Sequence, residues 1–337
     1  MKKIPLAVIP SFGLGDNIVY LLLAQNLARN GLDVTFIANH TVSLQAWLPT
    51  LKCIPFPPPE KTDELLDTYD LILSDASSIL TKNRTSDQKK RAVEKTVFIS
   101  TLTIADQLIE DHAERLEDLF GTVHPCLKAV ASASGRMRPS QETELSLVEQ
   151  TIEYCMEQLS LDPVATTIDF NIPAHLVYRE QPHRVLLHPS SYSSKKNWPL
   201  AKYIRLAKRL QKKGYQPLFL LSPKEREQWA SPVVAAGLAI ADTPDIESLA
   251  ELMYCSGYLI GNDSGNGHLA SALGIPVLTV HRKSSDPFHW RPGWGQNAIV
   301  RPVMAPKLLG KKIWTPFLSV GRAERAFHKL IRTVDAT

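Results

Sequence analysis

Cysteine is scarce in this sequence of 337 residues, and no two cysteines form a CxxC pair. The four thiols are widely separated along the chain, at Cys53, Cys126, Cys155 and Cys255. This spacing excludes a zinc knuckle and a disulfide framework. It predicts buried thiols in a protein of a reducing compartment.

Long hydrophobic runs are also missing, since no apolar stretch approaches the roughly 20 residues that span a bilayer. The amino terminus, MKKIPLAVIP, has the two lysines and the apolar residues of a signal peptide. However, its apolar run stops at Ser11, glycines follow, and there is no small-residue cleavage site. We therefore predict a buried first strand and a cytoplasmic protein.

An excess of charge of one sign is absent too, because the formal net charge is only +4. This value is too small to indicate a nucleic-acid partner. The charge is uneven, with six basic residues at Lys82, Arg84, Lys89, Lys90, Arg91 and Lys95. This stretch is either a solvated helix face or loop, or a patch for an anionic acceptor or for peripheral contact with an anionic inner-membrane surface.

What is present is an alternation of strand and helix patterns in two series. Hydrophobic residues make up 44% of the chain and charged residues 21%, which is typical of globular proteins. The length fits two domains. Continuous apolar strands separated by helices predict parallel sheets that are covered on both faces. We predict a first doubly wound domain over residues 1–165, a linker within 161–182, a second over 183–320, and a closing helix over 321–337 that packs back toward the first domain.

The first candidate loop is SFGLGDN, residues 11–17, directly after the first predicted strand. It lacks the third glycine of a dinucleotide fingerprint and the Gly-Lys-Ser/Thr of a phosphate-binding P-loop. Asp16 lies in the first turn of the following helix. It is either a helix cap or a general base that accepts the proton of an acceptor hydroxyl. The loop alone does not decide between these roles.

A second and a third loop carry groups that suit a diphosphate. Residues 188–199, HPSSYSSKKNWP, combine hydroxyls with two lysines, which donate to phosphate oxygens, although a serine-rich surface loop has the same composition. Residues 262–270, NDSGNGHLA, place glycines in the first turn of a helix, where bare backbone amides bind anions. His268 alone would be read as a packed core histidine, but within this motif it suits phosphate binding or loop orientation.

In this order and spacing, GLGD, HPSS…KKNWP and NDSGNGHLASALGIPVLTV resemble glycosyltransferase family 9, the ADP-heptose:lipopolysaccharide heptosyltransferases. The resemblance covers most of the chain, and its third motif is the most specific. It implies a GT-B fold, in which two Rossmann-like doubly wound parallel-sheet domains face each other across a cleft. It also implies an inverting transfer.

The resemblance further implies roles for particular residues. Asp16 takes the place of the catalytic aspartate and Lys196 that of the phosphate-stabilising lysine. A carboxylate near the nucleoside ribose falls on Glu225 or Glu227, and spacing does not choose between them. The other donor-binding positions implied are Gly15, Ser190, Ser191, Asp263, Ser264, Gly265, Gly267 and His268. The segment from Arg282 to Trp294 has no counterpart in the family pattern.

Together these features predict an inverting glycosyltransferase that uses no metal and no cofactor, since no DxD motif is evident. Its implied partners are a nucleotide-diphosphate sugar, with ADP-heptose as the default, and an anionic glycan or lipid-linked acceptor such as the lipopolysaccharide core. Two rivals stay open. A sugar-nucleotide epimerase of similar fold would isomerise the donor without an acceptor, and a non-catalytic nucleotide-sugar sensor would bind without turnover.

Overall fold

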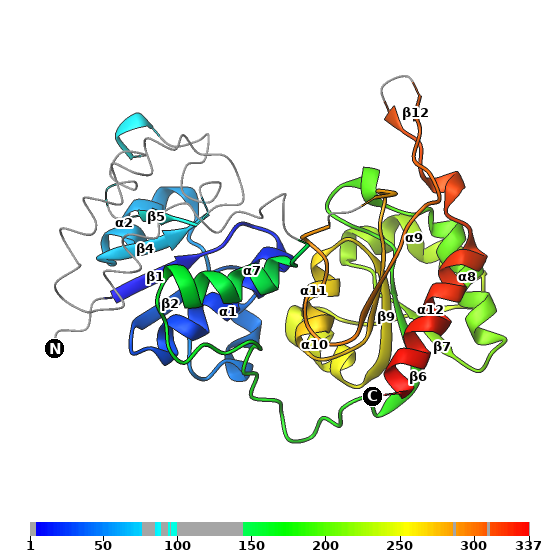
Figure 1. Cartoon of the computed structure of the whole chain (residues 1–337), viewed down its shortest axis with the longest axis horizontal. Helices are drawn as coiled ribbons and strands as arrows, with labels where there is room; N and C mark the ends of the chain where they lie inside the picture. The colour runs from blue at the N-terminus through cyan, green and yellow to red at the C-terminus, as the bar shows by residue number, and fades with distance from the viewer. Residues whose placement is uncertain are drawn as a thin grey trace. The chain divides into compact units, whose positions relative to one another are not determined.

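The computed structural model describes residues 5–75, 85–88, 94, 96–99, 144–285, 288–308 and 311–336 (Figure 1). The basic residues between Lys82 and Lys95, the helix expected over 106–120 and Cys126 lie outside these ranges. The helix expected over 141–159 begins later, as α7 (Leu147–Glu153), and continues as a π-helix (Tyr154–Gln158). Its start at Leu147 is set by a capping box in which Ser146 and Glu149 each bind the other's backbone amide.

The chain divides into two compact units, Met1–Asn171 and Ile172–Thr337. The first contains a parallel sheet of order β3-β2-β1-β4-β5 among the described residues. From β1 the chain adds β2 and β3 on one side of the sheet, and it then adds β4 and β5 on the other side, so the direction of winding changes between the neighbouring strands β1 and β4. In doubly wound sheets, ligands bind at the carboxyl ends of the strands at such a switch point. The strands are β1 (Pro5–Ile9), β2 (Asp33–Ile37), β3 (Lys52–Ile54), β4 (Leu71–Ser74) and β5 (Thr96–Phe98), with helices α1 (Leu14–Arg29) and α2 (Thr62–Asp67) between them.

The second unit repeats this winding in a parallel sheet of order β11-β10-β9-β6-β7-β8, with its switch point between β6 and β9. The expected alternation of strands and helices is therefore present in both halves. The strands are β6 (Gln181–His188), β7 (Gln216–Phe219), β8 (Ala239–Ile240), β9 (Ser256–Asn262), β10 (Val277–Val280) and β11 (Asn297–Val300). The helices are α8 (Leu200–Gln211), α9 (Pro223–Ala235), α10 (Ile246–Tyr254), α11 (Gly265–Ala272) and α12 (Val320–Asp335), and β12 (Lys307–Leu308) and β13 (Lys311–Lys312) form an antiparallel hairpin.

Much of the expected linker is bound to one unit or the other. Asn26 on α1 donates to Ala165 O and accepts from Ala165 N, at 3.0 and 2.6 Å. The Gln25 side chain likewise donates to Asp169 O and accepts from Asp169 N. These bonds attach the first part of the expected linker, as far as Asp169, to the first unit. Beyond the boundary, the Arg179 amide donates to Tyr254 O at 2.8 Å in the second unit.

The closing helix, α12, belongs to the second unit. Its buried stripe of Val320, Ala323, Phe327 and Leu330 joins the core cluster that also contains Leu206 and Leu210 of α8 and strands β6, β7, β9 and β10. The helical periodicity showed that one face is apolar, but it did not show which sheet covers that face.

Among the described thiols, Cys53 and Cys155 are buried and Cys255 is half-buried, and none forms a disulfide. Burial raises the pKa of Cys53 to about 11 and that of Cys155 to about 12, so both are neutral thiols. In the described parts of the chain, no helix combines the length and the apolar character needed to cross a bilayer.

Candidate functional site

The loop after β1 is held by a buried side chain of α1. Asn17 Nδ2 donates to the carbonyls of Ser11 and Gly13, each at 2.8 Å, and closes the turn. Gly13 is the N-cap residue of α1, and Asp16 is acidic in its first turn. A Cβ on Gly13 would overlap Asp16 Oδ2, so the absence of a side chain at Gly13 leaves room for this carboxylate.

Two residues that the sequence analysis did not single out, Tyr20 and Asp75, belong to the same electrostatic group as Asp16. The hydroxyl of Tyr20, one turn further along α1, donates to Ile99 O after β5. Burial raises the pKa of Tyr20 well above its usual value, and the nearby charges of Asp75 and Asp16 raise it further. Asp75 follows β4 and is only 4% exposed. The carboxyl edge of the first sheet therefore carries two carboxylates beside a neutral phenol.

In the second unit, His188 ends β6 and connects two of the predicted loops. Its Nδ1 lies 3.0 Å from Ser264 Oγ and its Nε2 lies 2.9 Å from Ser190 Oγ. Burial lowers the pKa of His188 to about 4, although the nearby Glu225 carboxylate raises it. The ring is therefore neutral at physiological pH and donates from one nitrogen while it accepts at the other.

Asn262 ends β9, the strand paired with β6, and also connects the second and third predicted loops. Its Oδ1 accepts the Trp198 backbone N–H at 3.1 Å and the Tyr203 hydroxyl at 3.0 Å. Its Nδ2 donates to Pro189 O at 2.6 Å. Since Asn262 is 2% exposed, these bonds satisfy a buried amide and fix the second and third loops to each other.

The predicted lysine and the predicted aspartate form an ion pair. Lys196 Nζ lies 2.7 Å from Asp263 Oδ2, with side-chain exposures of 37% and 13%. Lys196 ends a short 3₁₀ turn, and its amide donates to Ser193 O at 2.8 Å. Ser191 Oγ binds Ser193 O and Asn197 Oδ1 and so stabilises the same turn. The two loops thus place a cation and an anion side by side at the switch point of the second sheet.

Helix α11 begins immediately after this pair. Ser264 is its N-cap residue, yet the side chain binds His188 and caps no amide of the helix. The first amides of an α-helix have no i−4 acceptor within the helix; Gly265 adds no side chain at this end, and the Gly267 amide donates to Ser264 O at 3.1 Å. His268 is 3% exposed, and its Nδ1 has no hydrogen-bond partner in the described part of the chain. Burial lowers its pKa, against the opposing effect of Asp263.

Of the two carboxylates proposed for a ribose, Glu225 acts electrostatically on His188. It accepts the Ser222 amide at 2.8 Å in a capping box at the start of α9. Glu227 is exposed.

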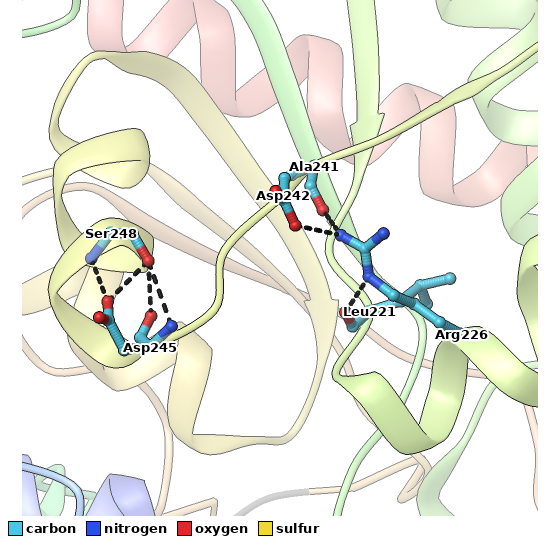
Figure 2. Close-up of polar contacts among 6 residues, drawn as sticks. All are labelled: Leu221, Arg226, Ala241, Asp242, Asp245 and Ser248. Carbon is cyan, nitrogen blue, oxygen red and sulfur yellow. Dashed lines mark hydrogen bonds and ion pairs between the residues drawn. The ribbon is translucent and has the colours of Figure 1, made fainter.

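Arg226, in the first turns of α9, donates to the Leu221 carbonyl at 3.4 Å, to the Ala241 carbonyl, and to Asp242 at 3.4 Å (Figure 2). Nearby, Asp245 caps α10 through Ser248 (Figure 2).

His281, which follows β10, is a further histidine that the sequence analysis did not select. It is 3% exposed, stacks on Phe288 with ring centroids 3.8 Å apart, and has an Nδ1 without a partner among the described residues. Burial lowers its pKa to about 4, while Asp263 raises it and Arg301 lowers it. The orphaned nitrogen, on a ring whose pKa responds to the charge of Asp263, makes His281 a candidate donor-contact residue.

The segment without a family counterpart packs on α11 where the structure describes it. The Trp294 amide donates to Ser271 Oγ at 2.9 Å, and the Trp290 ring lies edge-on to His268 at 6.2 Å. A Cβ on Gly267 would meet Pro292 Cγ at 3.4 Å, so the glycine lets this segment approach the helix. The aromatic residues therefore cover α11 and its histidine.

Neutral buried histidines predict a pH dependence of stability. His188 and His281 have pKa values of about 4 in the folded chain, against about 6.5 when unfolded. The unfolded chain binds more protons between these values, so the free energy of unfolding should fall as the pH drops from about 6.5 toward about 4. Urea unfolding at a series of pH values measures this slope. His281→Gln should show a shallower slope, and an unchanged slope would contradict the role of His281.

The structure therefore brings Ser190, Ser191, Lys196, Asp263 and the α11 amino end together in one unit, with Glu225 close to His188. Asp16 and Gly15 lie at the switch point of the other unit's sheet. In the described ranges, no group of three His, Cys, Asp or Glu side chains is arranged to hold a metal ion.

Two doubly wound parallel sheets in one chain, each with polar loops at its switch point, define the GT-B class of fold. The sequence profile of glycosyltransferase family 9 (heptosyltransferase) matches residues 127–307, more than half of the chain. The chain belongs to this family, which confirms the resemblance seen in its motifs. The matched range includes Lys196 and Asp263 but not Asp16.

Solved structures of similar fold cover nearly the whole chain. A family 9 glycosyltransferase from Veillonella parvula has a TM-score of 0.66 at 16% identity and covers 98% of this chain and 97% of its own. E. coli heptosyltransferase WaaC with ADP has a TM-score of 0.63 at 16% identity, with 97% and 99% covered. E. coli ADP-heptose lps heptosyltransferase II has 0.62 at 17%, with 98% and 99% covered. These likenesses confirm the predicted fold.

A curated relative, lipopolysaccharide heptosyltransferase 3 of Escherichia coli (strain K12), is 28% identical over 123 residues. The match covers 35% of this chain and 35% of that protein, so the chain spans about a third of the relative in this alignment.

Proposed function

We propose that this protein is an inverting glycosyltransferase that transfers a sugar from a nucleotide diphosphate to a glycan hydroxyl. The observation that carries the proposal is the group at the switch point of the second sheet. Lys196, the α11 amino end and the Ser190 hydroxyl belong to two loops there, which His188 and Asn262 join to each other. Such an arrangement suits a diphosphate, because amides, hydroxyls and a lysine all donate to phosphate oxygens.

The leaving nucleotide diphosphate gains negative charge as its bond to the sugar breaks. Lys196 and the positive end of α11 would stabilise that charge, which is the role that a divalent cation has in other transferases. Asp263 now pairs with Lys196, and a diphosphate would compete with this carboxylate for the ammonium group. We expect transfer to persist when EDTA is present.

Asp16 is the proposed general base. It would accept the proton of the acceptor hydroxyl while that oxygen attacks the sugar from the face opposite the leaving group, which inverts the anomeric centre. Tyr20, which is neutral, and Asp75 line the same sheet edge. Glu225 is the proposed ribose carboxylate in preference to Glu227, because of its position beside His188.

The proposed donor is ADP-heptose and the proposed acceptor is the lipopolysaccharide core, at the cytoplasmic face of the inner membrane. Support comes from the family match and from the names of the relatives, which include heptosyltransferases with ADP and with an ADP-heptose analogue. The donor-binding role proposed for Gly15 is based on the family resemblance alone.

The direct test is a transfer assay with ADP-heptose and core acceptors, with the anomeric configuration of the product read by NMR. A thermal-shift screen of nucleotide sugars complements it, since a ligand at 100 times its Kd adds about 2.7 kcal/mol of stability. A donor that stabilises the protein but is never transferred to any acceptor would overturn the enzymatic proposal. A donor that isomerises without an acceptor would indicate an epimerase.

Gly13→Ala tests the position of the Asp16 carboxylate without removing it. The new Cβ should displace Asp16 Oδ2, and a misplacement of about 1 Å can cost up to roughly 10²-fold in rate. Because Gly13 has a φ of −81°, alanine fits the backbone and the urea midpoint should change little. Gly321→Ala is the matched control, since its Cβ meets only ordinary contacts at 3.6 Å. An unchanged kcat in Gly13→Ala would argue against a base at this position.

A further inference from the structure

Helices α8 and α12 lie side by side on the outside of the second unit and carry a net excess of positive charge (Figure 1). Residues 200–213 and 320–335, all of which the structure describes, contain ten lysine and arginine residues and two acidic residues. Their net charge is therefore +8, against +4 for the whole chain, so all other residues together sum to −4. The positive charge is thus concentrated on these two helices.

Contacts between the helices leave this charge uncompensated at the surface. Glu324 of α12 is mostly buried and pairs with Arg209, at 3.0 Å, and Lys213, at 2.9 Å. Burial raises the pKa of Glu324, but these hydrogen bonds lower it overall, so the group is ionised. The other acidic residue, Asp335, is exposed at the carboxyl end of α12. Arg322, Arg325 and Lys329 are exposed and make no ion pair with a described residue.

We propose that the exposed lysine and arginine side chains of residues 200–213 and 320–335, here named the basic face, bind the surface of an anionic lipid bilayer. Two neighbouring helices present a broad array of cations, and cations held near an anionic membrane each add to its attraction. Lysine and arginine side chains on such helices also extend their charged ends into the headgroup layer.

Other anionic partners fit this surface less well. Tyr203 and Phe327, the tyrosine and the phenylalanine of α8 and α12, are both fully buried, so the basic face offers no tyrosine, phenylalanine or tryptophan ring on which a nucleobase can stack. A second copy of the chain would bring cations against cations, which is unfavourable.

Exposed apolar side chains adjoin the amino end of α12 and complement the charges. Val303 and Met304 are 62% and 52% exposed. The Val303 amide donates to Phe317 O at 3.1 Å, which holds this segment next to the turn that leads into α12. The hairpin of β12 and β13 follows and projects from the unit (Figure 1). Apolar side chains beside a cationic helix are the pattern of interfacial membrane binding.

The test is co-sedimentation of the full chain with vesicles of phosphatidylcholine and with vesicles that also contain phosphatidylglycerol. We expect binding only to the second kind, and we expect added salt to weaken it. The triple variant Arg322→Gln, Arg325→Gln and Lys329→Gln should bind roughly 100-fold more weakly, since each cation contributes about fivefold. Val303→Ser with Met304→Ser should also weaken binding while retaining its dependence on phosphatidylglycerol.

A matched control removes three exposed cations elsewhere, by Lys52→Gln, Lys61→Gln and Lys224→Gln, and should bind as the unchanged protein does. Circular dichroism verifies that each variant is folded. Equal binding by the two triple variants would overturn the proposal, as would equal binding to both kinds of vesicle or binding to DNA but to neither. The assay contains no sugar donor and no acceptor, so its result is independent of the proposed transferase activity.

Discussion

Asp16→Ala should reduce kcat by roughly 10²–10⁴-fold, the usual contribution of one general base. Donor affinity should change little, because the groups that we propose for the diphosphate belong to the second unit. Steady-state transfer kinetics give kcat, and calorimetric titration with ADP gives the affinity. This separation of kcat from binding distinguishes a base from a residue that holds the donor.

The matched control is Asp33→Asn, which neutralises an exposed carboxylate at the opposite edge of the same sheet. It should leave both quantities unchanged. Asp16→Asn, which keeps the shape of the side chain, should lose as much rate as Asp16→Ala if proton transfer is the function. If Asp16→Asn retained most of the activity, proton transfer would not be the function of this carboxylate.

Lys196→Ala should lower kcat by roughly 10²–10³-fold, as is typical when one group that stabilises developing negative charge is removed. Affinity for ADP should fall too, because the ammonium group would contact the phosphates before and after transfer. The free energy of unfolding should change by no more than about 1 kcal/mol, since the ion pair with Asp263 is partly exposed.

Lys195→Ala provides the comparison for this variant. Lys195 is the exposed neighbour in the same turn, and within the described ranges its carbonyl alone is engaged, as the acceptor of Trp314 Nε1 at 3.2 Å. Alanine keeps that carbonyl, so both kcat and ADP affinity should be retained. A similar loss in the two variants would mean that the overall positive charge of the loop supports transfer, and that Lys196 has no specific role in stabilising the leaving group.

The features that the sequence predicted are those determined by neighbours along the chain. The strand at residues 5–9, the glycine turn and the helix that follows are local patterns, and the structure contains all three. The Lys196 and Asp263 loops were found because each motif is contiguous. Their ion pair could not be read from the sequence, since the partners are 67 residues apart and meet only because β6 pairs with β9.

The roles of single residues at strand ends could not be assigned from the sequence for the same reason. His188, Asn262 and His281 each end or follow an apolar strand, and that position was the available signal. The choice between Glu225 and Glu227 had a local signal as well, because Ser222 and Glu225 have the spacing of a capping box. The placement of α12 had no such signal, since its apolar stripe fits any sheet of suitable size.

The bonds made by Asn262 separate positions that tolerate change from those that do not. The Asn262 side-chain amide binds Pro189, Trp198 and Tyr203, so a substitution of Asn262 would remove hydrogen bonds that hold the second and third loops together. Tyr192, by contrast, is a fully exposed residue of the second loop. A library of second-loop variants should therefore diversify the residues around Tyr192 and retain Asn262 in every member.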